Sequence, residues 1–152
     1  MRGVQPNYGG QMDMNSTLIV QFDDRYAPEI RRIRREVFGK EQGVDVAVDF
    51  DGQDPLAIHV VLQHDGQIVA TGRVLEDGHI GRLAVLKPYR RMGLGSAIVV
   101  ALIEEAAQLG LSRVYLGAQT RAVEFYRKLD FTEYGEPFVE AGIDHIAMQK
   151  AI

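Results

Sequence analysis

The segment from Arg90 to Ser96 has the residue types and spacing best suited to chemistry in this chain. It reads Arg-Arg-Met-Gly-Leu-Gly-Ser and stands just before a stretch with helical periodicity. Glycine lets the backbone approach a ligand closely, and the first N–H groups of a helix lack intrahelical acceptors and carry the positive end of the helix dipole. We therefore expect an anion site suited to a pyrophosphate, with Arg90 and Arg91 adding charge-assisted contacts.

Three phosphate-binding motifs compete for this segment, and spacing separates them. A P-loop requires a glycine, four intervening residues and then Gly-Lys-Ser or Gly-Lys-Thr, and the chain has no such run. A dinucleotide fingerprint requires glycine or alanine where Ile98 stands, and an acidic residue at a strand end where Gln119 stands. The pattern that remains is Arg-x-x-Gly-x-Gly, from Arg90 to Gly95.

The surrounding sequence predicts a strand before this turn and a helix after it. Apolar residues at helical spacing run from Leu94 to Leu109, and Gly110 ends the helix. Asp-Gly pairs at 65–66 and 77–78 predict tight turns, because both residues tolerate positive φ, and these turns separate three strands. The remaining pattern predicts strands at 17–22, 58–63, 67–76, 80–85, 113–118 and 145–149, and helices at 28–38 and 122–129.

Length and composition favour one domain. The chain has 152 residues, of which 46% are hydrophobic and 25% charged, as in ordinary soluble domains. We expect a flexible leader at residues 1–15 and one α+β domain at 16–152, with a mixed antiparallel and parallel sheet flanked by helices. The strand at 113–118 should lie parallel to the strand at 80–85, because a helical crossover joins them.

Charge and hydropathy exclude several partners. A net charge of −4 gives no electrostatic reason to expect nucleic acid. No apolar stretch is long enough to span a membrane, and the amino terminus has no hydrophobic signal core, so we expect a cytoplasmic protein. The sequence leaves a homodimer open.

Two charged segments have simple structural interpretations. The arginine-rich residues 31–35 most simply form a solvated helix face, with an anionic partner or a nearby carboxylate as alternatives. The acidic residues 49–55 resemble a calcium loop, but its twelfth position is Val60 where a bidentate glutamate is required. We therefore predict a turn there and no metal.

The glycine turn and its context together resemble the GNAT family of N-acetyltransferases. The order of strand, Arg-x-x-Gly-x-Gly turn, amphipathic helix, strand and second helix resembles the family's core over residues 58–150. The chain is also similar to the YjcF/ElaA-like branch, and Asp130, where the family usually has glycine, lies away from the cofactor site. The stretches that carry this similarity are 37–38, 41–44, 49–51, 70–73, 117–119 and 141–143, with His145 and Met148.

The resemblance implies acetyl-CoA as co-substrate and assigns roles to particular residues. Gln119 would bond the cofactor near its thioester end, and Tyr126 would face the sulfur; the alternative for Tyr126 is a core aromatic on a helix face. Backbone groups of one strand would bond the pantetheine arm as an added strand would, and amides of the turn would hold the pyrophosphate. These backbone groups belong to Leu83, Ala84 and Val85, and to Arg91, Met92, Gly93, Leu94, Gly95 and Ser96.

The implied reaction is acetyl transfer to an amine, on a small molecule or a protein. The chain has no cysteine, so direct attack in a ternary complex is favoured over a cysteine acyl-enzyme. An amine with a pKa of about 10.4 costs about 4 to 5 kcal/mol to deprotonate at pH 7, so the site must supply a base or desolvate the ammonium. Candidate bases are Glu41 and His79. Glu41 could instead be a helix cap or a salt-bridge partner, and His79 could instead be a solvent-facing residue. Weaker candidates for the site are Asp51, His145, Arg73 and His59.

Two other functions remain open. A CoA-binding regulatory module could keep the turn without efficient transfer, and a nicotinamide or nucleotide enzyme could use a similar turn. An intact Tyr126 and an unbroken glycine turn favour the acetyltransferase.

Overall fold

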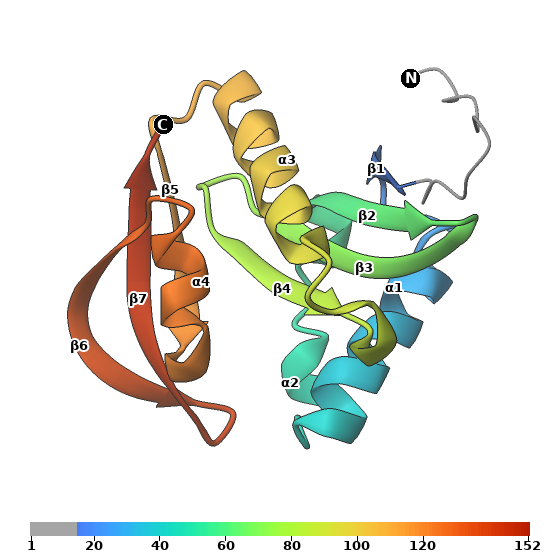
Figure 1. Cartoon of the computed structure of the whole chain (residues 1–152), viewed down its shortest axis with the longest axis horizontal. Coiled ribbons are helices and arrows are strands. Elements are labelled where there is room, and N and C mark those ends of the chain that lie inside the picture. The colour runs from blue at the N-terminus through green and yellow to red at the C-terminus, as the bar shows by residue number, and fades with distance from the viewer. Residues whose placement is uncertain (1–14) are drawn as a thin grey trace.

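The computed structural model describes residues 15–152 (Figure 1). The expected leader, residues 1–15, lies outside the described residues except for Asn15, which begins β1. The strands are β1 (Asn15–Val20), β2 (Ile58–His64), β3 (Gln67–Val74), β4 (Ile80–Val85), β5 (Arg113–Gln119), β6 (Thr132–Glu140) and β7 (Ile143–Ala151). The helices are α1 (Ala27–Arg34), the π-helix η1 (Arg35–Glu41), α2 (Val46–Asp49), α3 (Leu94–Gln108) and α4 (Val123–Arg127), with short 3-10 turns η2 (Asp54–Leu56), η3 (Lys87–Tyr89) and η4 (Thr120–Ala122).

The strands form two antiparallel sheets that meet at one point. One sheet has the order β1-β2-β3-β4 and the other the order β5-β7-β6. Within residues 15–152, one parallel bridge between His79 and Tyr115 joins them, supported by a 3.0 Å hydrogen bond from Tyr115 N–H to Gly78 O. The predicted parallel relation of β4 and β5 is therefore confirmed, but the two strands diverge beyond this bridge instead of continuing as one mixed sheet (Figure 1).

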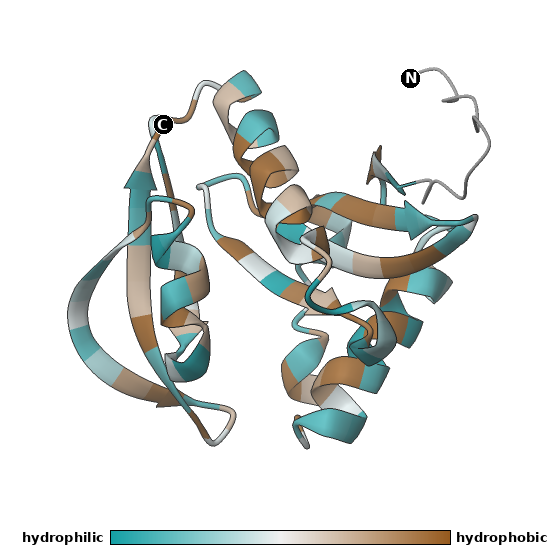
Figure 2. Cartoon of the chain, viewed as in Figure 1, coloured by the Kyte–Doolittle hydropathy of each residue, from teal (hydrophilic) through white to brown (hydrophobic). Residues whose placement is uncertain are grey.

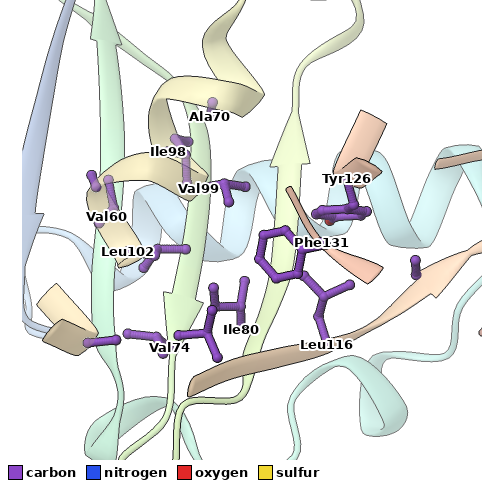
Figure 3. Packing of buried hydrophobic residues seen from close by; sticks show 14 of the residues in the cluster. Val60, Ala70, Val74, Ile80, Ile98, Val99, Leu102, Leu116, Tyr126 and Phe131 are labelled. Carbon is purple, nitrogen blue, oxygen red and sulfur yellow. The ribbon is translucent and has the colours of Figure 1, made fainter. Parts of the chain in front are cut away.

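Helices cover both faces of the four-stranded sheet. The apolar stripe of α3 packs on β2 and β3, where Ile98 and Leu102 are fully buried (Figures 2 and 3). A Cβ at Gly72 of β3 would lie 2.8 Å from Ile98 Cγ2, so helix and sheet are in direct contact there. On the opposite face, Ile33 of α1 packs against Ala84 of β4. The α3 face therefore holds the main core.

A β-bulge changes the side-chain alternation of β4. Two residues of β4, Arg82 and Leu83, oppose Gly72 of β3. Arg82 has a φ of 53°, which is uncommon for a residue other than glycine. Bulges of this kind redirect side chains. Leu83 packs on the α3 core, whereas the Arg82 side chain bonds to the segment around α2 on the α1 face.

Three features differ from the sequence-based expectations. β6 was not predicted, because Gly135 and Pro137 interrupt it and almost all of its residues are exposed, which leaves no apolar alternation. The first helix continues past Gly39 as the π-helix η1. The acidic segment contains the last residue of α2 and the turn η2, where a single turn was expected.

The interpretation of the arginine run as a solvated face is wrong for Arg34, which is 0% exposed. Its Nε donates to Asp49 Oδ1 at 3.0 Å, and its Nη1 donates to Asp54 Oδ1 at 2.7 Å. Arg73 of β3 donates to the same Asp54 oxygen at 2.8 Å. The two charged segments of the sequence thus bind each other in the interior.

Candidate functional site

The turn between η3 and α3 presents a run of unpaired backbone donors. No N–H from Arg91 to Ser96 has a hydrogen-bond acceptor within residues 15–152, and the first helical bond runs from Ala97 N–H to Gly93 O at 3.1 Å. Arg91 and Gly93 have φ of 65° and 78°, so the chain turns sharply before the helix begins. Consecutive amides at a helix start form a concave anion site of the kind that the sequence predicts.

Glycine has a different reason at each of the two motif positions. Gly93 has open space around it, but its positive φ favours glycine. Gly95 lies in the first turn of α3, where a Cβ would stand 3.3 Å from Phe125 Cζ. The absence of a side chain at Gly95 therefore lets Phe125 of α4 pack against the helix start.

The edge of β4 that faces β5 offers backbone groups next to this turn. Leu86 N–H donates to Val69 O at 3.0 Å, and bonded and non-bonded pairs alternate along an antiparallel ladder. The N–H and C=O groups of Val85, and of Leu83 beside the bulge, therefore point away from β3, whereas those of Ala84 point toward it. β4 thus has an open edge at the position where the resemblance implies the pantetheine arm.

Arg90 and Glu41 connect the turn to the end of η1. Arg90 Nε donates to Val85 O at 2.8 Å, which occupies one acceptor on the open edge of β4. Its Nη1 lies 2.8 Å from Glu41 Oε1, and its Nη2 donates to Glu41 Oε2 at 2.9 Å. The Glu41 carboxylate, a candidate base, is therefore held by a guanidinium group beside the turn.

Tyr126 lies at the margin of the main core. It is 9% exposed, and its ring packs edge-on to Phe125 and Phe131 at centroid distances of 4.9 and 5.7 Å (Figure 3). Burial raises its pKa well above that of an ordinary tyrosine. Its hydroxyl has no hydrogen-bond partner among the described residues. The phenol therefore stays protonated and can donate a hydrogen bond to a ligand.

Gln119 connects the end of β5 to the segment after η1. Its side-chain amide donates to Gln42 Oε1 at 2.9 Å, and its own oxygen accepts from Arg121 Nε at 3.2 Å. Sequence reasoning did not single out Gln42, since a lone glutamine after a helix carries no chemical signal. The contact brings together residues from both halves of the chain.

His79 lies where β4 and β5 meet. Its ring stacks on Tyr115 at a centroid distance of 4.7 Å, and the Tyr115 hydroxyl donates to Asp77. Burial, with a further contribution from Arg73 and Arg82, lowers the pKa of His79 despite the opposing charge of Asp77. His79 is therefore neutral at pH 7. At a strand rise of about 3.3 Å per residue, it lies about 20 Å from Val85, where β4 ends before the glycine turn.

The weaker candidates have structural partners. Asp51 accepts from Arg73 at 2.6 and 3.0 Å, and this contact, opposed by burial, holds its pKa well below the usual range. His59 Nε2 lies 2.8 Å from Asp54 O, and burial lowers the pKa of the imidazole. His145 stacks on Phe138, with Nδ1 2.6 Å from Ile143 O. Asp51, Arg73 and His59 thus belong to one network, in which Arg73 and His59 are buried and Asp51 lies at the surface.

The described part of the chain has neither a cluster of metal-binding side chains nor a membrane-spanning helix. Residues 15–152 contain no group of three or more histidine, aspartate or glutamate side chains placed to hold a metal ion. None of their helices is both long and apolar enough to cross a bilayer.

Comparison with known proteins agrees with this geometry. Residues 26–152 match the model of the acetyltransferase (GNAT) domain. Two Bacillus subtilis proteins are similar in sequence. The uncharacterized protein YyaT is 42% identical over 82% of this chain and 88% of its own length, and the uncharacterized N-acetyltransferase YjcF is 38% identical over 78% and 87%. The crystal structure of Escherichia coli ElaA superposes with a TM-score of 0.79 at 26% identity, covering 90% of this chain and 99% of ElaA.

These similarities confirm both the predicted family and the predicted branch. The family match covers the whole described chain from the residue before α1, so the turn, the open edge of β4 and Tyr126 all lie inside it. The chain therefore belongs to the GNAT acetyltransferase family and is an acetyl-CoA-dependent acyltransferase.

Proposed function

We propose that this protein transfers the acetyl group of acetyl-CoA directly to an amine acceptor, in a ternary complex of enzyme, cofactor and acceptor. The observation that carries the proposal is the run of unpaired N–H groups from Arg91 to Ser96. The first N–H groups of a helix have no intrahelical acceptor, and here the free N–H groups of the preceding turn adjoin them, so the run suits a pyrophosphate. A cytoplasmic location, where acetyl-CoA is made and used, belongs to the same proposal.

The cofactor arm would complete the open edge of β4. Amide groups of the pantetheine would pair with Val85 and Leu83, as an added strand does. Arg90 would then give up Val85 O, and its guanidinium would be free to contact the phosphates. Because the turn follows the end of β4, the arm runs back along the strand and brings the thioester toward Leu83 and Arg82.

Tyr126 would assist the leaving group as a hydrogen-bond donor. The amine nitrogen attacks the thioester carbonyl carbon, the C–S bond breaks, and the sulfur leaves with its electron pair. A thiol has a pKa near 8.5, and the pKa of Tyr126 is raised above about 10, so full proton transfer from the phenol is uphill. A hydrogen bond to the developing thiolate needs no such transfer, and it stabilises charge that appears only as the bond breaks.

For the proton of the amine, we propose His79 acting through water, with Glu41 as the alternative base. A neutral imidazole can accept a proton, and His79 lies about 10 Å along β4 from Arg82, on the side to which the arm points. Glu41 is nearer to the turn, but its carboxylate already binds Arg90. Gln119 would contact the cofactor near its thioester, from the facing end of β5.

Two measurements test the proposal. Calorimetry should show saturable binding of acetyl-CoA, and a thiol-release assay with a panel of amines should show acceptor-dependent CoA formation. Binding without acceptor-dependent release would instead indicate a CoA-binding regulatory module. An absence of binding heat with acetyl-CoA, together with stabilisation by NAD or ATP, would reject the acetyltransferase proposal and would favour a nicotinamide or nucleotide enzyme.

A further inference from the structure

We propose that the acceptor is an amino acid or a closely similar zwitterion, whose carboxylate binds Arg82 while its amine attacks the thioester. This inference rests on the acetyl transfer proposed above and adds the chemical class of the acceptor. Three features of the structure support it: an unbalanced charge, a free pair of donors and the position of the bulge in β4.

The arginine–aspartate network on the α1 face, buried at its centre, has one more positive charge than negative charges. Within residues 15–152, its ion pairs join four arginines to three aspartates, and four positive charges against three negative ones leave a net charge of +1. His59 adds no charge, because burial lowers its pKa. The members are Arg34, Arg35, Arg73 and Arg82 with Asp49, Asp51 and Asp54.

Arg82 is the member best placed to use this excess charge. Arg34 and Arg73 have side chains only 1% and 4% exposed and are committed to aspartates. Arg35 and Arg82 have side chains 30% and 23% exposed, and of these two Arg82 is the one that stands on β4, next to its open edge. Burial and the charge of Arg73 lower the pKa of Arg82, more than its carboxylate neighbours raise it. The positive charge of Arg82 is thus incompletely balanced by the protein.

Part of the Arg82 guanidinium is also free to bind a ligand. Its Nε donates to Asp49 O at 3.0 Å, and its Nη2 donates to Val48 O and Asp51 Oδ2 at 3.2 Å each. Its Nη1 has no hydrogen-bond partner among residues 15–152. An arginine whose far side is fixed by backbone carbonyls and whose Nη1 N–H groups are free is already oriented for a carboxylate.

The bulge places this guanidinium beside the reaction centre. Arg82 stands one residue before Leu83, where the open edge of β4 begins and the thioester end of the cofactor arm is expected. Its side chain lies on the α1 face, opposite the α3 core, so it does not compete with the cofactor arm for the strand edge. An acceptor that approaches from the α1 face meets the guanidinium next to the thioester.

The charge has opposite effects on the two groups of an amino acid. A nearby positive charge disfavours an ammonium and lowers its pKa, which reduces the cost of forming the free amine. The same charge weakens the binding of a simple amine or a polyamine. A carboxylate close to the amine offsets that loss, so a zwitterion gains both binding and reactivity.

The test compares acceptors that differ only in the carboxylate. With the full-length protein at saturating acetyl-CoA, thiol release is measured for the common amino acids, their amides, the matching decarboxylated amines and amino-alkyl phosphates. We expect at least one amino acid to exceed its amide and its decarboxylated amine about tenfold or more in kcat/KM. Equal rates with amides, or faster rates with decarboxylated amines, would overturn the inference, and faster rates with phosphates would replace the carboxylate by a phosphate.

Two variants connect the selectivity to this residue. Arg82→Gln should remove most of the difference between acid and amide, mainly through KM for the acid, and should leave the Kd of acetyl-CoA within about twofold. Arg82→Lys, which keeps the charge without the guanidinium geometry, should retain part of the selectivity and controls for a loss of folding. Selectivity that survives in a folded Arg82→Gln protein would overturn the assignment to Arg82.

Calorimetry separates a failure of this inference from a failure of the proposed function. Amino acids and their amides are titrated into the protein saturated with CoA. Carboxylate-selective binding that depends on Arg82 supports the acceptor class even if no thiol is released. In that case only the proposed acetyl transfer is contradicted. Measurable transfer to amines with no carboxylate selectivity leaves acetyl transfer in place and overturns only the acceptor class.

Discussion

The glycine turn and the buried arginine–aspartate network use polar groups in opposite ways. The turn leaves the N–H groups from Arg91 to Ser96 without acceptors within the described chain. The network pairs nine of its twelve guanidinium nitrogens with oxygen acceptors, and among described residues Arg35 Nε is the buried side-chain atom left without a partner. The turn is therefore suited to bind a ligand, and the network is suited to fix a structure.

Arg82 combines properties of both regions. Its Nε and Nη2 bind the loop around α2, as a structural arginine would, while its Nη1 remains free as in the turn. Whether all hydrogen-bond donors of a charged group have acceptors separates structural charges from binding charges here better than burial alone does. Five predictions test this comparison.

The largest expected effect is on stability, from Asp54→Ala in the network. Asp54 accepts hydrogen bonds from Arg34 and Arg73 at 2.7 and 2.8 Å. Removal of its carboxylate therefore leaves two buried guanidinium groups without this acceptor and its negative charge. Breaking one partner of a buried ion pair costs about 3 to 5 kcal/mol. Urea denaturation should show this loss in the free energy of unfolding.

An exposed pair provides the matched control for Asp54→Ala. Glu29 binds Arg32 at 2.7 Å, with both side chains about half exposed. Glu29→Ala should cost less than about 1 kcal/mol. Similar losses for the two variants would show that the network contributes no more than a surface pair.

The next effect is on turnover, from Tyr126→Phe. The variant removes the donor to the departing sulfur and keeps the ring that packs on Phe131. We expect kcat to fall about 100-fold, within the range for such catalytic groups, while the Kd of acetyl-CoA stays within about twofold. Steady-state kinetics and calorimetry measure the two quantities.

Tyr134→Phe is the corresponding control. The Tyr134 hydroxyl accepts a hydrogen bond from Arg113 Nη2 at 3.0 Å and lies on β6, which has no part in the proposed mechanism, so its loss should reduce stability by no more than about 1 kcal/mol without a comparable loss of kcat. An unchanged kcat in Tyr126→Phe would remove Tyr126 from the mechanism.

The two regions also differ in how well the sequence predicts them. The turn depends on neighbours in the chain, so the glycine spacing and the helix that follows were enough to predict both its conformation and its ligand class. The order of the main elements and the parallel relation of β4 and β5 followed from periodicity and Asp-Gly turns in the same way. β6 was missed because its exposed residues carry no such pattern.

The network depends on residues far apart in the sequence. Arg34 lies 20 residues from Asp54, and Arg73 lies 19 residues from it. No local pattern distinguishes an arginine that turns inward from the neighbouring Arg31 and Arg32, which are exposed. The bulge that directs Arg82 to the α1 face is likewise a property of pairing between strands. The arginine run is compatible with a nearby carboxylate, but no local pattern identifies which aspartates pair with which arginines.

An intermediate effect is expected on cofactor affinity, from Gly93→Ala. Gly93 has a φ of 78° and open space, so a methyl group meets no atom but strains the backbone by about 1 to 2 kcal/mol. Relief of that strain would rotate the amides of the turn. We expect the Kd of acetyl-CoA to rise about tenfold in calorimetry.

Gly110→Ala makes the same change at the other end of α3. Gly110 also has a positive φ, 83°, and no atom within 4 Å of an added Cβ. Both variants should lose similar stability, but Gly110→Ala should keep the affinity for acetyl-CoA. Equal loss of affinity in both would mean that the turn has no special role.

A smaller effect should appear in acid. Burial opposes the shift, but the contacts of Arg34 and then Arg73 lower the pKa of Asp54 below its ordinary value. A carboxylate with a lowered folded pKa stabilises the protein above its unfolded pKa of about 3.9, and this stability is lost as pH falls through the folded pKa. The free energy of unfolding of the wild type should therefore fall more steeply below pH 4 than that of Asp54→Ala. Parallel curves would contradict the pairing.

The smallest effect is expected from Glu41→Gln, at the end of η1, the helix whose first residue, Arg35, belongs to the network. Its carboxylate binds Arg90, and Arg90 in turn occupies Val85 O beside the turn. The amide removes a negative charge near the expected pyrophosphate and releases Arg90 toward it. Partly exposed ion pairs contribute up to about 1 kcal/mol, so the Kd of acetyl-CoA should fall by no more than about fivefold, with kcat nearly unchanged. A loss of kcat near 100-fold would instead identify Glu41 as the general base, and His79 would then have no catalytic role.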